Sequence, residues 1–139
     1  MTISKTPELT FGFVPKKALR AWVPFLIYTL LIIQGAILRP NRIPAFIYRI
    51  NDKLLHGLEF FLLFFLALNA FLGMRWRRSE AMAVIYCAFM GGLTEFLQLY
   101  VPGRSCDVKD WLADMAGTLF GLAIIASIWK VSGRTGWGR

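Results

Sequence analysis

The sequence is poor in charge, cysteine and histidine, and each shortage excludes a class of protein. Charged residues make up 17% of the 139 residues, whereas a soluble domain has about 25%. The chain has eight acidic residues, two cysteines and one histidine. Acidic tails, low-complexity tracts and fixed-period repeats are absent from it, which excludes a disordered chain and a solenoid. Phosphate-binding glycine loops, nucleophile-elbow serines and paired-cysteine zinc patterns are absent as well.

Apolar sequence is abundant instead. Hydrophobic residues make up 57% of the chain, and the formal net charge is +8. Most of such an apolar chain cannot face water, which is unusual for a nucleic-acid-binding protein. We therefore predict no nucleic-acid partner. The apolar residues form four runs, at 21–38, 54–73, 81–101 and 111–129, and a helix of about 17–25 such residues crosses a bilayer. We predict an all-α integral membrane protein, built as a four-transmembrane-helix bundle.

The basic residues predict an orientation. Four spans place both termini on one side of the membrane, where ten of the 16 Lys and Arg residues fall, including the 75–78 loop. The positive-inside rule then predicts that both termini are cytoplasmic. Residues 1–20 are expected to form a cytoplasmic basic arm, 21–130 the membrane domain and 131–139 a cytoplasmic tail. Membrane lipids are the expected partners of this basic surface.

Polar residues in and beside the spans gather at the opposite, non-cytoplasmic end. They come from the start of the second span, the end of the third, the following loop and the start of the fourth. We predict that they form one outward-facing binding site. Its members are Asp52, Lys53, His56, Glu95, Gln98, Arg104, Asp107, Asp110 and Asp114.

Helical spacing predicts which of these side chains point inward. Asp110, Asp114, Gly117 and Gly121 recur every three or four residues and so share one helix face. This face should point into the bundle, because a carboxylate that faces lipid is costly. Glu95 is expected about two turns inside the end of its span, where it needs a cation. The cations available at this end are Lys53, His56, Arg104 and Lys109.

The cluster has a structural and a functional interpretation. It is either an ion-pair network that locks the loops to the bundle or a pocket for a lipid headgroup or glycan. His56 with carboxylates from three segments could also ligate a hard or borderline cation. However, no single segment has the spacing of metal ligands, so neither a metal nor another cofactor is predicted.

Three motifs together resemble one known family. They are Asp52-Lys53-x-x-His56, then Glu95-x-x-Gln98-x-x-x-Pro102-Gly103-Arg104, and then Asp110, Gly117 and Gly121. The pattern resembles the VanZ-like family of small bacterial multi-pass membrane proteins, over about residues 51–125. The founding member is an accessory factor in resistance to a glycopeptide antibiotic. The resemblance implies a bacterial cell-envelope context, in the cytoplasmic membrane, and a shared outward polar site.

One position departs from the family pattern. Where this chain has Asp114, the family usually has Asn. The acid adds a negative charge beside Asp110, which makes a neighbouring cation such as Arg104 more necessary.

The leading functional hypothesis is that the site binds or handles an amphiphile. The expected ligand is a lipid, a lipid-linked glycan or a glycopeptide-type antibiotic. Arg104 and Lys53 would bind a phosphate or carboxylate of this ligand. Its hydroxyls and amides would be bound by Gln98, Asp107 and Asp110.

Two alternatives belong to other classes. A hydrolase or transferase at the headgroup level would have His56 and Glu95 as its candidate catalytic residues. His56 would act as base or nucleophile, oriented by Asp52 or Glu95. A non-catalytic accessory subunit of a larger complex would bind a membrane-protein partner through Gly117 and Gly121, or through the Phe-rich 60–71 face.

Overall fold

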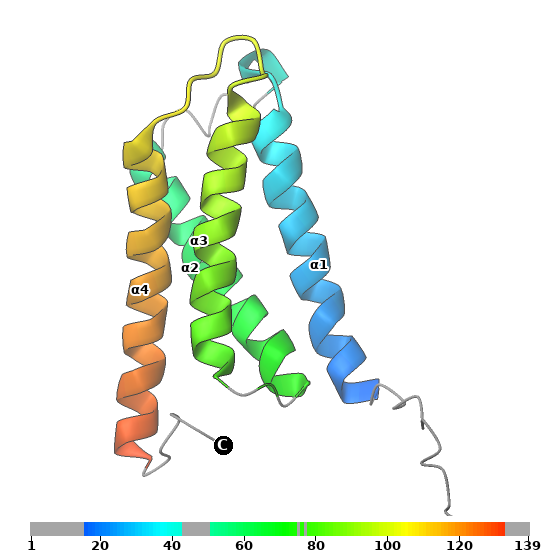
Figure 1. The fold of residues 1–139 in the computed structure, drawn as a ribbon, viewed down its shortest axis with the longest axis vertical. Coiled ribbons are helices and arrows are strands. Elements are labelled where there is room, and N and C mark those ends of the chain that lie inside the picture. The colour runs from blue at the N-terminus through cyan, green and yellow to red at the C-terminus, as the bar shows by residue number, and fades with distance from the viewer. Residues whose placement is uncertain (1–15, 43–50, 75, 77, 133–139) are drawn as a thin grey trace, which may run out of the picture.

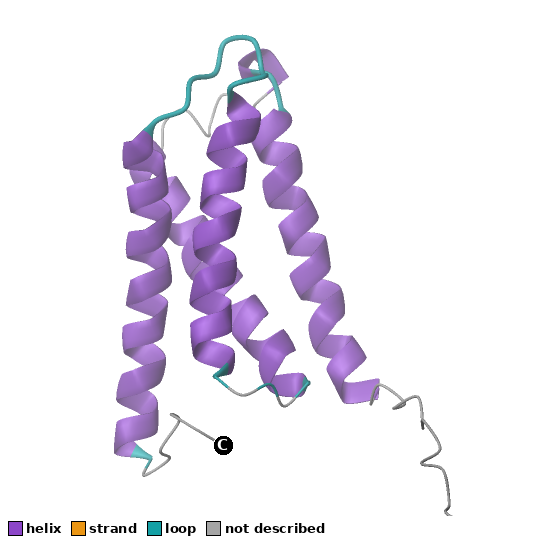
Figure 2. Ribbon diagram, viewed as in Figure 1, coloured by secondary structure: helices purple, strands orange, loops and turns teal. Residues whose placement is uncertain are grey.

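The chain folds into four long helices. The computed structural model describes residues 16–42, 51–74, 76 and 78–132 (Figure 1). The helices are α1 (Lys16–Ile37), α2 (Asp52–Gly73), α3 (Ser79–Gln98) and α4 (Val108–Val131), with a short 3-10 helix, η1, at Pro40–Arg42. The described residues include no strand (Figure 2). All four long helices have the length and apolarity needed to cross a membrane, which confirms the predicted all-α, four-span fold class.

The helix bounds differ from the predicted spans at several ends. The predicted basic arm is helical from Lys16 onward, while its residues 1–15 and the tail residues 133–139 lie outside the described residues. The third span was predicted to reach residue 101, but α3 ends at Gln98. The cause is Pro102, which lacks a backbone N–H and disfavours the helical conformation of the residue before it. Glu95 therefore lies in the last turn of α3, and its predicted depth of two turns was wrong.

Side-chain caps explain where α2 and α4 begin. The first N–H groups of a helix have no acceptor within the helix and need one from outside. Asn51 Oδ1 accepts a hydrogen bond from the Leu54 N–H at 3.2 Å. Likewise, Asp107 Oδ1 accepts one from the Lys109 N–H at 2.9 Å. Asp52 and Asp110 follow in the first turns, where the helix dipole favours a negative charge.

The helices pack with α2 at the centre. It contacts α1, α3 and α4, and α3 also contacts α1 and α4. The beginning of α1 and the end of α4 lie at the same end of the bundle (Figure 1). The other end, which we call the polar end, is formed by the last turns of α1 and α3 and the first turns of α2 and α4. The 99–107 loop and η1 cover it (Figure 1).

Large apolar side chains are found on the surface of the bundle as well as in its interior. The core includes Phe60 and Phe64, which are almost fully buried. Large apolar side chains also point outward on several helices: Leu30 is 65% exposed, Phe89 63% and Phe120 63%. Soluble proteins rarely expose apolar patches on this scale, whereas lipid is a suitable environment for them.

Glycines allow α2 and α4 to approach closely. A Cβ atom at Gly117 would overlap the carbonyl group of Gly57, and one at Gly121 would lie 2.8 Å from the Phe64 ring. The glycine stripe of α4 therefore faces α2 inside the bundle, as its spacing predicts. Since α2 of the same chain covers these glycines, a partner helix would need another face of α4.

The α2–α4 contact predicts a large difference between two glycine substitutions. Gly117→Ala forces the backbones apart, and we expect it to lower the free energy of unfolding by about 1–3 kcal/mol. Gly92→Ala is the matched control, because a Cβ there meets nothing within 4 Å. Thermal unfolding of both variants in the same lipid nanodiscs measures the difference. Equal stability of the two variants would contradict the close approach of α2 and α4.

Candidate functional site

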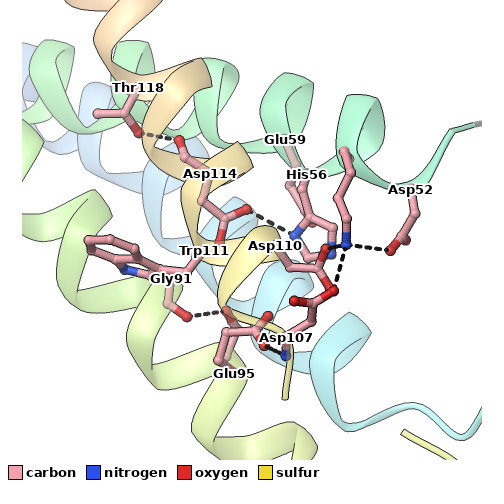
Figure 3. Close-up of polar contacts among 12 residues, drawn as sticks. Asp52, His56, Glu59, Gly91, Glu95, Asp107, Asp110, Trp111, Asp114 and Thr118 are labelled. Atoms are coloured by element: carbon pink, nitrogen blue, oxygen red, sulfur yellow. Dashed lines mark hydrogen bonds and ion pairs between the residues drawn. The ribbon is translucent and has the colours of Figure 1, made fainter. Parts of the chain in front are cut away.

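The candidate site lies at the polar end, where α2 and α4 begin and α3 ends (Figure 3). Of the eight acidic residues in the chain, six lie here. They are Asp52, Glu59, Glu95, Asp107, Asp110 and Asp114 (Figure 3). Glu59 was not among the predicted site residues. The signal that could have identified it is its position one turn after His56, on the same face of α2.

The innermost part of the site is a hydrogen-bonded His56–Asp114 pair. His56 Nδ1 lies 2.9 Å from Asp114 Oδ1, with side-chain exposures of 14% for His56 and 0% for Asp114. A buried carboxylate is stable only with a nearby positive charge or hydrogen-bond donors. His56 meets this need for Oδ1, whereas Oδ2 of Asp114 has no hydrogen-bond partner among the described residues.

This pair corrects two expectations. The carboxylate that orients His56 is Asp114, whereas Asp52 or Glu95 was expected in this role. The cation-capable group beside Asp114 is His56, whereas Arg104 was expected there. The reason is the crossing of α2 and α4 at Gly57 and Gly117, which brings their facing side chains together.

A second group surrounds the ammonium of Lys53. Lys53 Nζ forms a short ion pair with Asp110 and a longer one with Asp107 at 3.2 Å. Its distance to Asp52 Oδ2 is 3.8 Å. The Lys109 backbone N–H, and then the Lys53 ammonium, lower the pKa of Asp107 below its usual value. Three aspartates from α2, α4 and the loop thus converge on one cation.

Glu95 ties α3 to the start of α4, and no basic side chain of the described residues pairs with it. Its side chain is nearly buried, at 4% exposure. Oε2 accepts a hydrogen bond from the Asp107 backbone N–H at 2.7 Å, and Oε1 has no partner within the described part of the chain. None of the four cations expected beside Glu95 forms an ion pair with it in the described part of the chain, where a backbone donor takes that place. Gln98 is buried one turn later on α3.

Arg104 binds the end of α1. Its Nε and Nη2 donate to the carbonyls of Leu38, at 3.2 Å, and Gly35, at 3.0 Å. The last carbonyls of a helix lack partners within it and favour a positive charge nearby. Gly103, with φ of +84°, makes the turn that precedes Arg104. Arg104 thus joins the 99–107 loop to α1, rather than pairing with the carboxylates of the site.

The floor of the site contains two residues, Trp111 and Gly91, that were not among the predicted site residues. Trp111 Nε1 donates to the Ala88 carbonyl at 3.2 Å, which holds α4 against α3. A Cβ on Gly91 would lie 2.9 Å from the Trp111 ring and 3.0 Å from Asp114 Oδ2. Gly91 therefore provides the space in which Trp111 and Asp114 pack. The available signal was the Gly91-Gly92 pair within an apolar span.

Part of the site has the spacing of metal ligands. One nitrogen of His56 and one carboxylate oxygen each from Asp52 and Asp110 lie within 4.8 Å of one another. Because these residues come from two helices, no single segment carried a metal-ligand pattern.

Comparison with known proteins identifies one family. The model of the VanZ/LLP1 family matches residues 14–130. An uncharacterised protein of the fission yeast Schizosaccharomyces pombe is 33% identical over 82 residues, which cover 58% of this chain and 50% of that protein. The chain therefore spans about half the length of this curated relative. No solved structure matches. Since this relative is eukaryotic, the similarity does not assign a bacterial source.

Two substitutions of Asp114 separate its hydrogen bond from its charge. Asp114→Asn keeps an oxygen acceptor for His56, so we expect little loss of stability. Asp114→Leu leaves His56 without that partner, and we expect a loss of about 1–3 kcal/mol in the free energy of unfolding. Thermal unfolding in nanodiscs measures stability, and the ¹⁵N NMR signal of the single imidazole reports the bond. An unchanged imidazole signal in Asp114→Leu would contradict the pair.

Proposed function

The chain belongs to the VanZ/LLP1 family, and from this premise we propose that its polar end binds the polar headgroup of an amphiphile. The observation that carries the proposal is the gathering of six carboxylates at the end of a bundle of membrane-spanning length, with Lys53 and His56 paired to four of them. Polar residues placed this way in a membrane domain are costly and usually functional. The site also reaches the surface of the molecule, since the Asp52 side chain is 68% exposed.

The charges favour a headgroup rich in hydroxyl or amine groups. Arg104 already donates to the carbonyls of α1, and Lys53 is already surrounded by aspartates. A phosphate would therefore meet mainly carboxylates, which repel it. Carboxylates accept hydrogen bonds from hydroxyl and ammonium groups. Of the amphiphiles expected from the sequence, a lipid-linked glycan or a glycopeptide-type antibiotic fits better than a simple phospholipid.

The apolar part of such a ligand would lie in the surrounding lipid. A groove of about 420 Å³ runs between α1 and α3, but its lining includes Trp22 and Trp76 at the opposite end of the bundle. It does not adjoin His56. The ligand is therefore selected through its headgroup, with membrane insertion providing a high local concentration.

A second candidate function is acid–base catalysis at the headgroup. The observation that favours it is the His56–Asp114 hydrogen bond. A carboxylate bound to one imidazole nitrogen orients the ring and leaves the other nitrogen to act as a base. In this candidate His56 is the catalytic residue. Glu95 acts only by holding the Asp107 backbone.

Headgroup selection is testable with two ligands that share one alkyl chain. Octyl glucoside and octyl phosphate are added to the nanodisc-embedded protein, below their micelle concentrations and with a chelator present. We expect octyl glucoside to shift the His56 ¹⁵N signal in a saturable way and octyl phosphate to have little effect. Asp110→Asn should weaken the glucoside effect, because it removes the negative charge and one of the two acceptor oxygens of a buried side chain. Ser132→Ala, at the opposite end of α4, serves as the control. A response to octyl phosphate alone would refute the proposed selectivity.

The proposed orientation places the polar end outside the cytoplasm, as the bias of basic residues predicts. Cys106 lies at this end, is free and is exposed, whereas Cys87 is buried. We expect a membrane-impermeant maleimide to label Cys106 from outside intact cells and to leave Cys106→Ser unlabelled. Desolvation and the nearby Glu95 raise the pKa of this thiol, so labelling should proceed faster at mildly alkaline pH. Labelling of Cys106 only in broken cells would contradict this orientation and place the polar end in the cytoplasm.

A further inference from the structure

We infer that His56, Asp52 and Asp110 form a binding site for a divalent transition-metal ion, with Asp114 orienting the histidine. The site shares residues with the proposed headgroup site, but the inference does not depend on any amphiphile. Its first observation is geometric. One potential ligand atom from each of the three residues lies within 4.8 Å of the other two, so one ion can contact all three.

The second observation is the hydrogen bond behind His56. Asp114 is fully buried, and its Oδ1 lies 2.9 Å from His56 Nδ1. An ionised carboxylate can only accept, so Nδ1 carries a proton, and in the neutral imidazole Nε2 then has the free lone pair that can bind a metal ion. Metal-binding histidines almost always have such a partner, which fixes the ring and raises its basicity. The pair therefore presents Nε2 as a ligand.

The third observation is uncompensated negative charge. Asp114 Oδ2 and Glu95 Oε1 are both buried and have no hydrogen-bond partner among the described residues. Arg104 donates to α1, so it does not offset this charge through a direct contact. Lys53 already forms ion pairs with three aspartates. An added divalent cation would reduce the repulsion among these carboxylates.

The chemical type of the three metal-binding atoms indicates which ions the site would prefer. Mg²⁺ and Ca²⁺ prefer sites made only of oxygen atoms. An imidazole nitrogen with two carboxylates suits first-row transition metals such as Zn²⁺. Three protein ligands leave a coordination position for water or a ligand oxygen, as in catalytic zinc sites. The exposure of Asp52 gives the ion a path from solvent.

Lys53 competes for the same aspartates. Its ammonium contacts Asp110 and lies near Asp52, where an ion would need their oxygens. The side chain is 40% exposed, and its long stem allows the ammonium to move away while it stays near Asp107. Removing this charge should therefore strengthen metal binding. If the aspartates serve only to bind Lys53, its removal would lower stability without raising the affinity for metal.

The test is a Zn²⁺ titration of the full chain by calorimetry. The protein is placed in phosphatidylcholine nanodiscs without a polyhistidine tag and in a Cys106→Ser background. These choices leave His56 as the sole histidine and remove the exposed thiol. We expect one Zn²⁺ per chain, and His56→Gln or Asp110→Asn should weaken binding at least tenfold. Asp114→Asn should weaken it by about 10–100-fold, the usual effect of changing an outer partner of a ligand.

Two variants make the result decisive. Asp107→Asn changes the charge as Asp110→Asn does but removes none of the three ligands, so it should weaken binding far less. Lys53→Met should tighten binding, a gain that cannot come from misfolding. The inference is overturned by absent binding, by equal effects of Asp107→Asn and Asp110→Asn, or by unchanged affinity in Lys53→Met. This titration contains no glycan ligand and the headgroup titration contains a chelator, so either proposal can fail alone.

Discussion

The close contact between α2 and α4 is the constraint on which the candidate site depends. Gly117 lies so near Gly57 that a single Cβ would overlap the facing carbonyl. At this separation His56, which is next to Gly57, meets Asp114, which lies about one turn before Gly117, and the two side chains form a hydrogen bond. A wider separation would leave Asp114 buried without a partner, which is among the costliest arrangements in a membrane protein. The glycines and the His56–Asp114 pair are thus parts of one arrangement.

Helix direction explains why charges of opposite sign separate at the polar end. The N-termini of α2 and α4 lie there, and Asp52, Asp107 and Asp110 occupy their caps and first turns. The C-terminus of α1 lies there as well, and Arg104 donates to its last carbonyls. These four charges lie near the helix ends whose dipoles favour them, whereas Lys53 in the first turn of α2 and Glu95 in the last turn of α3 do not. As a result, the carboxylates gather around Lys53 and His56, and this arrangement is the basis for proposing a cationic or hydrogen-bond-donating ligand.

Much of the fold was predictable because the bilayer restricts it. A membrane span must be a long apolar helix whose backbone groups bond within it, so the length of each apolar run predicts an element. The α-helical spacing of Asp110, Asp114, Gly117 and Gly121 correctly predicted an inward face. The end of α3 was less accurately predicted, since apolar residues continue beyond Gln98 up to Pro102 while the helix ends at Gln98.

The sequence by itself determined the number of helices and which polar residues meet at one end. Both follow from hydropathy and from the alternating direction of successive spans. Only the tertiary structure decided which groups pair. Glu95 and Arg104 form hydrogen bonds with backbone groups. Residues of every type carry such groups, so the residue types in the sequence do not show where these bonds form. His56 meets Asp114, rather than Asp52 or Glu95, because the crossing of α2 and α4 sets the direction of both side chains.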